Sequence, residues 1–343
     1  MKPTVAVAVS GGVDSLMAAY LLKDHGHPVV GFHFLTGYES GQRNIESIAD
    51  QLDIPLHIYD LADAFESRVI RYFLQTYQAG KTPNPCLQCN PTIKFGLLFD
   101  QAQKKGIDRL ATGHYARIAR DNQHPNRIRL LRGIDQHKDQ SYFLAFLSRQ
   151  QLSHALFPLG KYDKESVKKL AAEKGLIPAT KAESQDVCFI TESSSAQFLA
   201  RHIGSGSNPG DIVDRSGHVL GQHEGLHLFT VGQRRGINCP ADEPYYVLRL
   251  DAECNQLIVG HKQDTLSGIC RVERINWIQS VPTEPIRVRT QVRYRHKAAA
   301  ATLLPLEQNQ AEVRFDKPQS SIAPGQGAVF YIGEELIGGG IIL

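Results

Sequence analysis

The sequence predicts an α/β fold with a parallel sheet in its first part and a small β-barrel in its last part. Apolar runs suited to strands alternate with helical patterns over the first 110 residues, and a glycine turn joins the first strand to the first helix. Beyond about residue 197, short and evenly spaced strands with turn residues dominate. Alternating strands and helices with short links are typical of a parallel sheet covered on both faces, and evenly spaced short strands are typical of a barrel.

The elements of the first part can be placed from their patterns. Strands are predicted at residues 5–9, 29–34, 56–59 and 110–111, and helices at residues 16–22, 45–52, 62–77 and 93–105. Two features interrupt this alternation. One is a proline-rich loop at residues 81–90, which cannot be helical throughout. The other is a hairpin with strands at 115–119 and 127–131.

Later segments are shorter and more irregular. Helical patterns return at residues 140–147 and 166–174, and residues 178–190 are irregular. The stretch at residues 164–174 is most simply a solvated helix. A linker-like run follows at 204–210, with short strands at 211–213 and 219–220. Alternation is clear over residues 286–295. It predicts that the arginines of this strand project on one barrel face; they are Arg287, Arg289, Arg293 and Arg295.

Composition narrows the class of protein. The chain has 343 residues, enough for two or three domains with cores of their own, and its 42% hydrophobic and 21% charged content is typical of a soluble globular protein. No apolar run approaches the roughly 20 residues of a membrane span. The N-terminus leads directly into the first strand and leaves no room for a signal peptide, so we expect a cytoplasmic protein. A net charge of +3 is too mild to indicate a nucleic-acid binder by itself.

The glycine turn has the features of a phosphate-binding loop. Residues 10–15 read Ser-Gly-Gly-Val-Asp-Ser, and they lie between a predicted strand and a predicted helix. Glycines let the backbone approach an anion closely, and the first turn of a helix offers unpaired N–H groups. The loop has neither the Gly-Lys-Ser/Thr of a Walker loop nor the dinucleotide G-x-G-x-x-G. Because ligands bind at the carboxyl ends of parallel strands, residues 10–15, the segment after Phe34 and residues 112–114 should converge.

The cysteines indicate chemistry rather than structural disulfides. Cys86 and Cys89 form a C-x-x-C pair, and Cys188 lies in the irregular segment. The pair could be half of a zinc site, although no second pair completes it. With Cys188 as a third ligand it could hold an iron–sulfur cluster with one open iron. Alternatively, Cys89 and Cys188 form a catalytic pair that carries sulfur by thiol exchange. The other three cysteines are expected to be structural thiols.

These motifs resemble two known groups of proteins. The loop at residues 10–15 resembles the PP-loop of the ATP pyrophosphatase superfamily, whose members split ATP between the α- and β-phosphates. The chain as a whole closely resembles the tRNA-specific 2-thiouridylases, in the right order and over nearly its whole length. The segments that carry this resemblance are residues 80–95, 111–115, 138–144, 184–189, 229–236, 293–295 and 324–331.

The resemblance implies three domains and a reaction. They are a PP-loop ATP-binding catalytic domain at residues 1–197, a small central domain at 198–268 and a tRNA-binding C-terminal β-barrel at 269–343. The reaction is thiolation of carbon 2 of the wobble uridine in the tRNAs for Lys, Glu and Gln. ATP would adenylate the uridine oxygen. A persulfide on Cys188 would supply the sulfur, with Cys89 as the nucleophile, and the two cysteines could later form a disulfide.

The resemblance also implies binding residues. Asp14 would help hold Mg²⁺, which prefers oxygen ligands and bridges phosphates. ATP would be bound by Ala8, Val9, Ser10, Gly11, Gly12, Val13, Asp14, Ser15, Phe34 and Gly113. The target base would be lined by Asn84, Pro85 and Cys86. The tRNA would be contacted by His114, Lys138, Asp139, Gln140, Tyr294, Arg295 and Gln326. The expected partners are tRNA and a persulfide donor, either a cysteine desulfurase or a sulfur-relay protein, and a monomer is expected.

One departure from the family pattern bears on the chemistry. Many family members carry Asp where this chain has Cys86, and a thiol is a poor substitute for a carboxylate. Asp186 remains as a candidate acid or base. The substitution yields three cysteines, Cys86, Cys89 and Cys188, so an alternative is a [4Fe–4S] cluster that binds sulfide on its open iron.

Two other classes compete with a thiolation enzyme. One is a PP-loop amide-forming ligase of the GMP or NAD synthetase type, and the paired cysteines argue against it. The other is a non-enzymatic, metal-bound tRNA-binding protein, and the intact loop at residues 10–15 argues against that.

Overall fold

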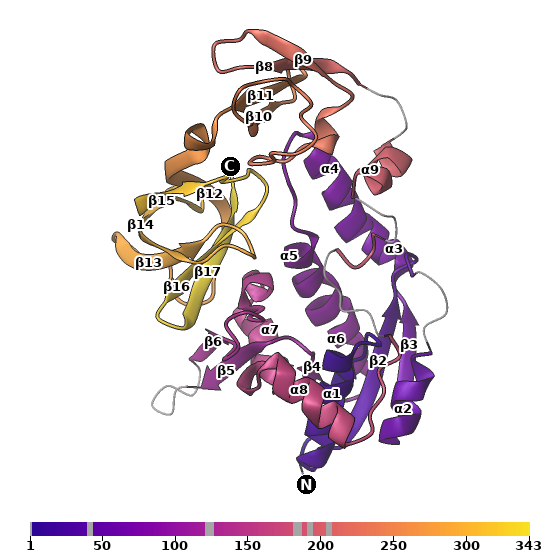
Figure 1. Cartoon of the computed structure of the whole chain (residues 1–343). Coiled ribbons are helices and arrows are strands. Elements are labelled where there is room, and N and C mark those ends of the chain that lie inside the picture. Colours follow the sequence, from indigo (N-terminus) through magenta and orange to yellow (C-terminus); the bar gives the residue numbers. More distant parts are fainter. Residues whose placement is uncertain (1, 40–43, 121–126, 181–186, 191–194, 204–207) are drawn as a thin grey trace.

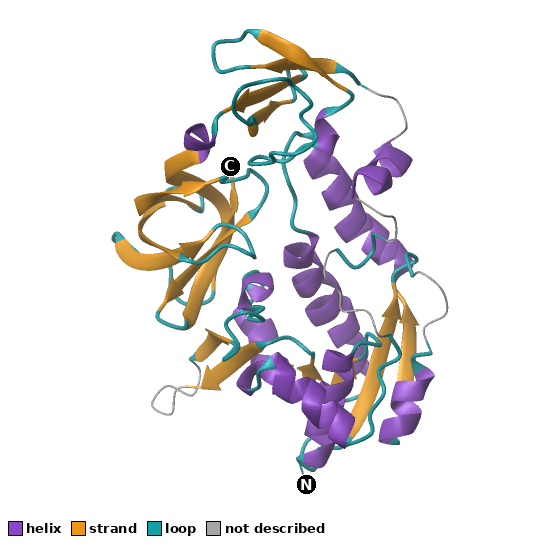
Figure 2. Ribbon diagram, viewed as in Figure 1, coloured by secondary structure: helices purple, strands orange, loops and turns teal. Residues whose placement is uncertain are grey.

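The computed structural model describes residues 2–39, 44–120, 127–180, 187–190, 195–203 and 208–343. Figure 1 shows three parts: a layered α/β part that contains the N-terminus, a barrel beside it, and a small β part beyond the end of α4 (Arg71–Gln78). Figure 2 shows that helices dominate the first part and strands the other two. Among the described residues, no helix is long and apolar enough to span a membrane.

The first part is built on a parallel sheet, as the sequence predicts. It has five strands in the order β3-β2-β1-β4-β7. These strands are β1 (Val5–Ala8), β2 (Val29–Leu35), β3 (Leu56–Asp60), β4 (Leu110–Ala111) and β7 (Ala155–Leu156). The last of them was not predicted, because it directly follows the helix at Arg149–His154 and has no strand pattern separate from it. Apolar side chains fill both faces of the sheet and bind it to helices on each side.

Helices cover the two faces of this sheet. One face packs against α1 (Val13–Asp24), α2 (Glu46–Leu52) and α8 (Lys164–Glu173). The other packs against a kinked helix made of α5 (Pro85–Cys89), η2 (Asn90–Leu98) and α6 (Phe99–Lys104). This helix begins at Pro85 rather than at the predicted residue 93, because proline is well tolerated at the first helical position. We name it the cysteine helix, since it carries Cys86 and Cys89.

Both long helices depart from regular α-helical geometry. The cysteine helix is kinked in η2, where Gly96 has the non-helical angles φ −104° and ψ −106°. The predicted helix at 62–77 is confirmed as α3 (Ala62–Phe65), η1 (Glu66–Ile70) and α4 (Arg71–Gln78), and η1 is a short π-helical stretch.

The predicted hairpin joins the first part to the barrel. It consists of β5 (Ala116–Arg120) and β6 (Ile128–Arg132), and its turn lies outside the described residues. Strand β6 pairs with the barrel strand β17 (Glu335–Ile342), so one sheet runs through both parts. After the hairpin come η3 (Ser141–Leu144), α7 (Arg149–His154) and η4 (Pro158–Lys161). The helix predicted at 140–147 is therefore only a single 3-10 turn.

The last two parts are mostly β. The central part follows α9 (Ser195–Ile203) and contains η5 (Leu226–Leu228), β8 (Gly210–Val213), β9 (Val219–His223), β10 (Tyr246–Asp251) and β11 (Gln256–Gly260). After η6 (Lys262–Thr265), the barrel contains β12 (Leu266–Trp277), β13 (Ile286–Gln291), β14 (Ala299–Leu306), β15 (Gln310–Ser320), β16 (Gly327–Ile332) and β17. Strand β12 pairs with both β15 and β17, so the six strands close and the predicted barrel is confirmed.

One prediction for the barrel is wrong. Strand β13 ends at Gln291, so Arg293 and Arg295 do not extend the face that carries Arg287 and Arg289. The chain turns after Gln291, and the guanidinium of Arg293 donates hydrogen bonds to the carbonyl oxygens of Val231 and Ser321, at 3.2 and 2.9 Å. The prediction failed because the alternating pattern of the sequence continues to Arg295, whereas Gln291 is the last residue of β13 that pairs with β16.

Candidate active site at the glycine loop and the cysteine helix

The loop at residues 10–15 has the geometry of an anion site. Gly11 has φ +94°, a conformation that favours glycine, and helix α1 begins at Val13. The two serines fix the loop, because the backbone N–H and the hydroxyl of Ser10 lie 3.1 and 3.2 Å from the Ser15 hydroxyl oxygen, which donates to Gly12 O. No side chain caps the helix, so the N–H groups of its first turn face the loop without a side-chain acceptor.

The carboxylate of Asp14 has a buried cationic partner that sequence reasoning missed. The Lys164 ammonium lies 2.7 and 2.8 Å from the two Asp14 oxygens, and the Tyr115 hydroxyl donates to one of them at 2.8 Å. Lys164 is only 5% exposed, so the expectation that residues 164–174 form a solvated helix is wrong at its first residue. An Mg²⁺ ion that used Asp14 as a ligand would compete with Lys164 for the same oxygens.

The neighbouring strand end lies directly against the loop. A Cβ atom on Gly113 would lie 2.8 Å from the Asp14 carbonyl carbon and 2.9 Å from the Ser15 nitrogen. The next residue, His114, has its Nδ1 2.7 Å from the Thr112 hydroxyl. Burial, with a contribution from the charge of Lys94, holds the pKa of His114 well below its usual range. The loop at 10–15 and residues 112–114 therefore converge as predicted.

The end of β2 completes the same edge of the sheet. The buried His33 binds the carbonyl oxygen of Val9 through Nδ1 at 2.7 Å, which ties β2 to the start of the loop. Phe34 follows it and is half-buried, with contacts to the apolar clusters on both sides of the site. Ala8 ends β1 at this edge and is also half-buried.

The cysteine helix places two thiols in a buried environment. Cys89 is buried and Cys86 is half-buried. Burial raises the pKa of Cys86 to about 11 and that of Cys89 to about 12. The charge of Lys94, further along the helix, opposes this rise for both thiols. Both thiols are therefore protonated near neutral pH in this structure.

Cys188 lies close enough to Cys86 and Cys89 to raise the pKa of both thiols electrostatically. It is exposed, whereas the next residue, Phe189, is buried and packs edge-on against Phe73 with the ring centroids 5.2 Å apart. Earlier in the same irregular segment, the Thr180 N–H donates to Gly11 O at 3.1 Å. The segment therefore contacts the glycine loop at one end and the cysteine helix at the other. Asp186 lies outside the described residues.

The three cysteines of this site are the candidate ligands of an iron–sulfur cluster. Within the described part of the chain, no group of three His, Cys, Asp or Glu side chains could hold a metal ion. Cys86, Cys89 and Cys188 therefore do not form a ligand set for an iron–sulfur cluster here.

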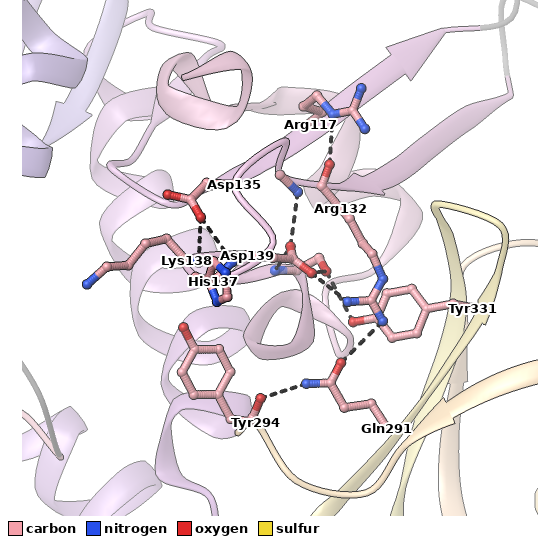
Figure 3. A network of polar contacts seen from close by, with 11 residues as sticks. Arg117, Arg132, Asp135, His137, Lys138, Asp139, Gln291, Tyr294 and Tyr331 are labelled. Carbon is pink, nitrogen blue, oxygen red and sulfur yellow. Dashed lines mark hydrogen bonds and ion pairs between the residues drawn. The ribbon is translucent and has the colours of Figure 1, made fainter. Parts of the chain in front are cut away.

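Two of the residues predicted to contact tRNA, Lys138 and Asp139, belong to a polar network (Figure 3). Asp139 is buried; one carboxylate oxygen contacts Arg132 at 2.9 Å, and the other accepts the N–H groups of Gly133 and Ser141 at 3.0 Å. Gln140 accepts the Tyr115 N–H at 3.1 Å. Lys138 is half-buried. These contacts give Asp139 a positioning role, and a contact between it and tRNA stays a prediction.

The same network reaches the barrel. The Arg132 guanidinium lies 3.6 Å from the centre of the Tyr331 ring and donates to the Gln291 side chain at 3.3 Å. Gln291 in turn donates to the carbonyl oxygen of Tyr294 at 2.7 Å. Tyr294 packs on Phe143 with ring centroids 4.2 Å apart. Arg295 is exposed, and Gln326 is half-buried on the turn before β16. The residues predicted to contact tRNA thus come from both the first part and the barrel.

This arrangement defines a class of protein and then a family. The sheet, the loop after β1 and the helices define an α/β protein of the HUP class: residues 3–192 match the family description "tRNA methyl transferase HUP domain". Residues 196–261 match a tRNA methyl transferase PRC-barrel domain, and residues 267–342 match an aminomethyltransferase β-barrel domain. More particularly, the chain belongs to the family of tRNA-specific 2-thiouridylases MnmA, as its full-length relatives establish.

Two of these relatives cover almost all of the chain. The tRNA-specific 2-thiouridylase MnmA of Desulfosudis oleivorans is 49% identical over 343 residues, covering 99% of this chain and 95% of the relative. That of Rippkaea orientalis is 46% identical over 347 residues, covering 98% and 99%. Among solved structures, NMN synthetase from Francisella tularensis is 15% identical with a TM-score of 0.36 over 57% of this chain and 71% of its own. That likeness is too weak to carry an argument.

Proposed function

We propose that the protein replaces the C2 oxygen of the wobble uridine of tRNA with sulfur, in the tRNAs for Lys, Glu and Gln, and that it does so in the cytoplasm as a monomer. The observation that carries this proposal is the 49% identity over 99% of the chain to a tRNA-specific 2-thiouridylase. The family descriptions speak of methyl transfer, but the full-length relatives are named for thiolation. The proximity of Cys188 to Cys86 and Cys89 fits sulfur transfer.

ATP activates the uridine in the first half of the proposed reaction. The C2 oxygen attacks the α-phosphate, the bond to the β-phosphate breaks, and pyrophosphate leaves. The phosphates are bound by the N–H groups of residues 10–15, and the adenine lies beside Phe34 and Gly113. Lys164 supplies positive charge at the loop. When bound, Mg²⁺ would neutralise phosphate charge, with Asp14 as its protein ligand.

Sulfur enters in the second half. A desulfurase or a relay protein first leaves a persulfide on Cys188. In one route the terminal sulfur attacks C2 and AMP leaves with the oxygen; Cys89 then attacks the Sγ of Cys188, which releases 2-thiouridine and forms a Cys89–Cys188 disulfide. In the other route Cys89 attacks first and frees sulfide, which displaces AMP. In both routes, a thiol reductant then restores the two cysteines.

In this proposal, one group of residues contacts the target base and another contacts the rest of the tRNA. Asn84, Pro85 and Cys86 line the target base, and His114, Lys138, Asp139, Gln140, Tyr294 and Arg295 contact the tRNA. Because the pKa of His114 is lowered, its ring is neutral near pH 7 and can accept or donate one hydrogen bond without adding charge.

Thiolation of tRNA in vitro tests the proposal. With ATP, unmodified tRNA, a desulfurase and cysteine, the wild-type protein should form 2-thiouridine, seen as retardation in mercury-containing gels. The Cys188→Ser variant should form none and still release pyrophosphate, whereas Cys254→Ser, which changes an exposed cysteine of the central part, should remain active. Thiolation by Cys188→Ser at the wild-type rate would refute the sulfur-carrier role.

The cluster-dependent alternative needs its own measurement. Protein purified without oxygen is assayed for iron and acid-labile sulfide. Colourless protein that thiolates tRNA without iron excludes a cluster, and about four irons for each active chain would establish one.

A further inference from the structure

The barrel contacts the segment that leads into the cysteine helix. We call residues 82–85 the base segment and residues 323–327 the barrel turn. The amide nitrogen of Gln326 donates to the carbonyl oxygens of Thr82 and Pro83, at 3.1 and 2.9 Å. In the opposite direction, the Thr82 N–H donates to the carbonyl oxygen of Pro324 at 2.8 Å. Three hydrogen bonds therefore join two segments that lie more than 240 positions apart.

The barrel turn is itself held rigidly. The Gly325 N–H donates to Ile342 O at 2.8 Å, and the Ile342 N–H donates back to Gln326 O at 2.9 Å. Gly325 has φ +88°, and a Cβ atom there would lie 2.9 Å from Thr82 O. The turn is thus anchored on the end of β17, and it approaches the base segment as closely as a backbone without a side chain allows.

The base segment has few groups that could form hydrogen bonds within the segment. Pro83 and Pro85 have no N–H to donate, and no side chain caps the helix at Asn84. Asn84 O accepts the Leu87 N–H at 3.2 Å, which starts the cysteine helix. The Leu87 side chain is buried against the barrel turn, where a Cβ atom on Gly327 would lie 2.6 Å from its Cδ1. The start of the helix is therefore positioned from the barrel side and by Tyr72 of α4, to which the Asn84 backbone is hydrogen-bonded.

We propose that Gln326 is a positioning residue of the thiolation site: by bracing the carbonyl groups of Thr82 and Pro83, it sets the place of Asn84 and of the helix that carries Cys86 and Cys89. This inference rests on the proposed function for its catalytic consequence. It differs from a direct contact between Gln326 and tRNA, because it assigns the side-chain amide to the protein backbone. The barrel is then part of the active site and not only an RNA-binding surface.

Substitution of Gln326 tests the proposal, with a matched control in the same barrel. Gln326→Met keeps the length of the side chain and removes its donor, and Gln326→Glu keeps its shape and places a carboxylate against two carbonyl oxygens. Gln319 also donates to two adjacent carbonyl oxygens, those of Lys317 and Pro318, but within its own strand. Gln319→Met therefore removes the same kind of bonds without touching the base segment.

Three measurements are made on each variant: iodoacetamide labelling of Cys86 and Cys89 by peptide mass spectrometry without substrates, tRNA affinity by filter binding, and the single-turnover thiolation rate at saturating tRNA. In both Gln326 variants, iodoacetamide should label Cys86 and Cys89 about threefold faster or more, and thiolation should be about tenfold slower. The affinity for tRNA should stay within about twofold of wild type, because displacement of the reacting groups lowers the reaction rate more than it weakens binding. Gln319→Met should match wild type.

Two results would overturn the proposal. The first is a loss of tRNA affinity with an unchanged rate at saturation, which would make Gln326 a plain tRNA contact. The second is labelling of Cys86 and Cys89 at the wild-type rate in both variants. If the wild-type protein forms no 2-thiouridine, the proposed function fails, and the labelling comparison still decides whether Gln326 braces the cysteine helix.

Discussion

At the scale of single residues, the contact between Lys164 and Asp14 joins the glycine loop to helix α8. Lys164 is buried, whereas the Asp14 side chain is about one-third exposed, at 34%. A buried ammonium requires a partner, because desolvation of an isolated charge is costly. The pair thus fixes the position of the only carboxylate in the loop at residues 10–15.

Replacing Lys164 tests the weight of this pair. Lys164→Met should lower the free energy of unfolding by about 1–3 kcal/mol, less than a fully buried pair because water reaches Asp14. It should also weaken ATP binding, measured by calorimetry. In the control Lys169→Met, which breaks an exposed pair with Glu173, we expect a change of at most about 0.5 kcal/mol. If Lys164→Met and Lys169→Met unfold at the same urea concentration, the pair of Lys164 and Asp14 does not stabilise the fold as expected.

The thiol of Cys89 leads to a prediction for pH dependence. Burial raises its pKa to about 12, so the thiolate, the reactive form, is scarce at neutral pH and increases as pH rises. Without substrates, the rate of Cys89 alkylation should rise about tenfold per pH unit from pH 8 to 10, whereas that of free cysteine levels off above its ordinary pKa of about 8.5. Peptide mass spectrometry measures both rates, and a plateau for Cys89 near pH 9 would contradict burial of the thiol.

Short sequence motifs could be predicted more readily than contacts between residues that lie far apart in the sequence. The loop at residues 10–15 and the cysteines could be found because their chemistry lies in a few adjacent letters. Lys164 could not, because its partner Asp14 is 150 positions away and only the fold brings them together. Asp139 illustrates the same limit: its sequence context suggests a surface contact, whereas its carboxylate is buried in a network with Arg132.

At the scale of elements, the end of β4 and the start of α1 form one unit. Gly113 lies so close to Asp14 and Ser15 that no side chain fits between them. Since the contact atoms are backbone, a larger residue must displace the first turn of α1 and its N–H groups.

Gly113→Ala should therefore weaken ATP binding by about tenfold or more, because shifts of about 1 Å at a binding site have effects of this size or larger. Gly268→Ala is the matched control: a Cβ atom at Gly268 would meet no atom within 4 Å. Calorimetric titration with ATP measures both. If Gly113→Ala binds ATP as wild type does, the nucleotide does not bind where these two elements meet.

Element types followed from periodicity, but their ends did not. The helix that carries the cysteines starts at Pro85, eight positions before the predicted residue 93, because proline favours a first helical turn as readily as a loop. Strand β13 ends at Gln291 although its alternation continues to Arg295. In both cases tertiary contacts decide where an element stops, and local patterns do not contain them.

At the scale of the whole molecule, the three parts act on one another through a few defined contacts. The hairpin β5–β6 adds to the barrel sheet through β17, and Gln326 joins the barrel to the base segment that leads into the cysteine helix. The sequence predicts the parallel sheet and the barrel. It does not predict that they share a sheet, because the pairing of β6 with β17 connects residues about 200 positions apart.

The central claim is that the glycine loop activates a uridine oxygen and the cysteines replace it with sulfur. It is tested most directly with tRNA that carries ¹⁸O at C2 of the wobble uridine. Mass spectrometry of the AMP formed during thiolation shows where this oxygen goes. The account predicts one ¹⁸O in the phosphate of AMP for each 2-thiouridine formed. Unlabelled AMP alongside 2-thiouridine would contradict it.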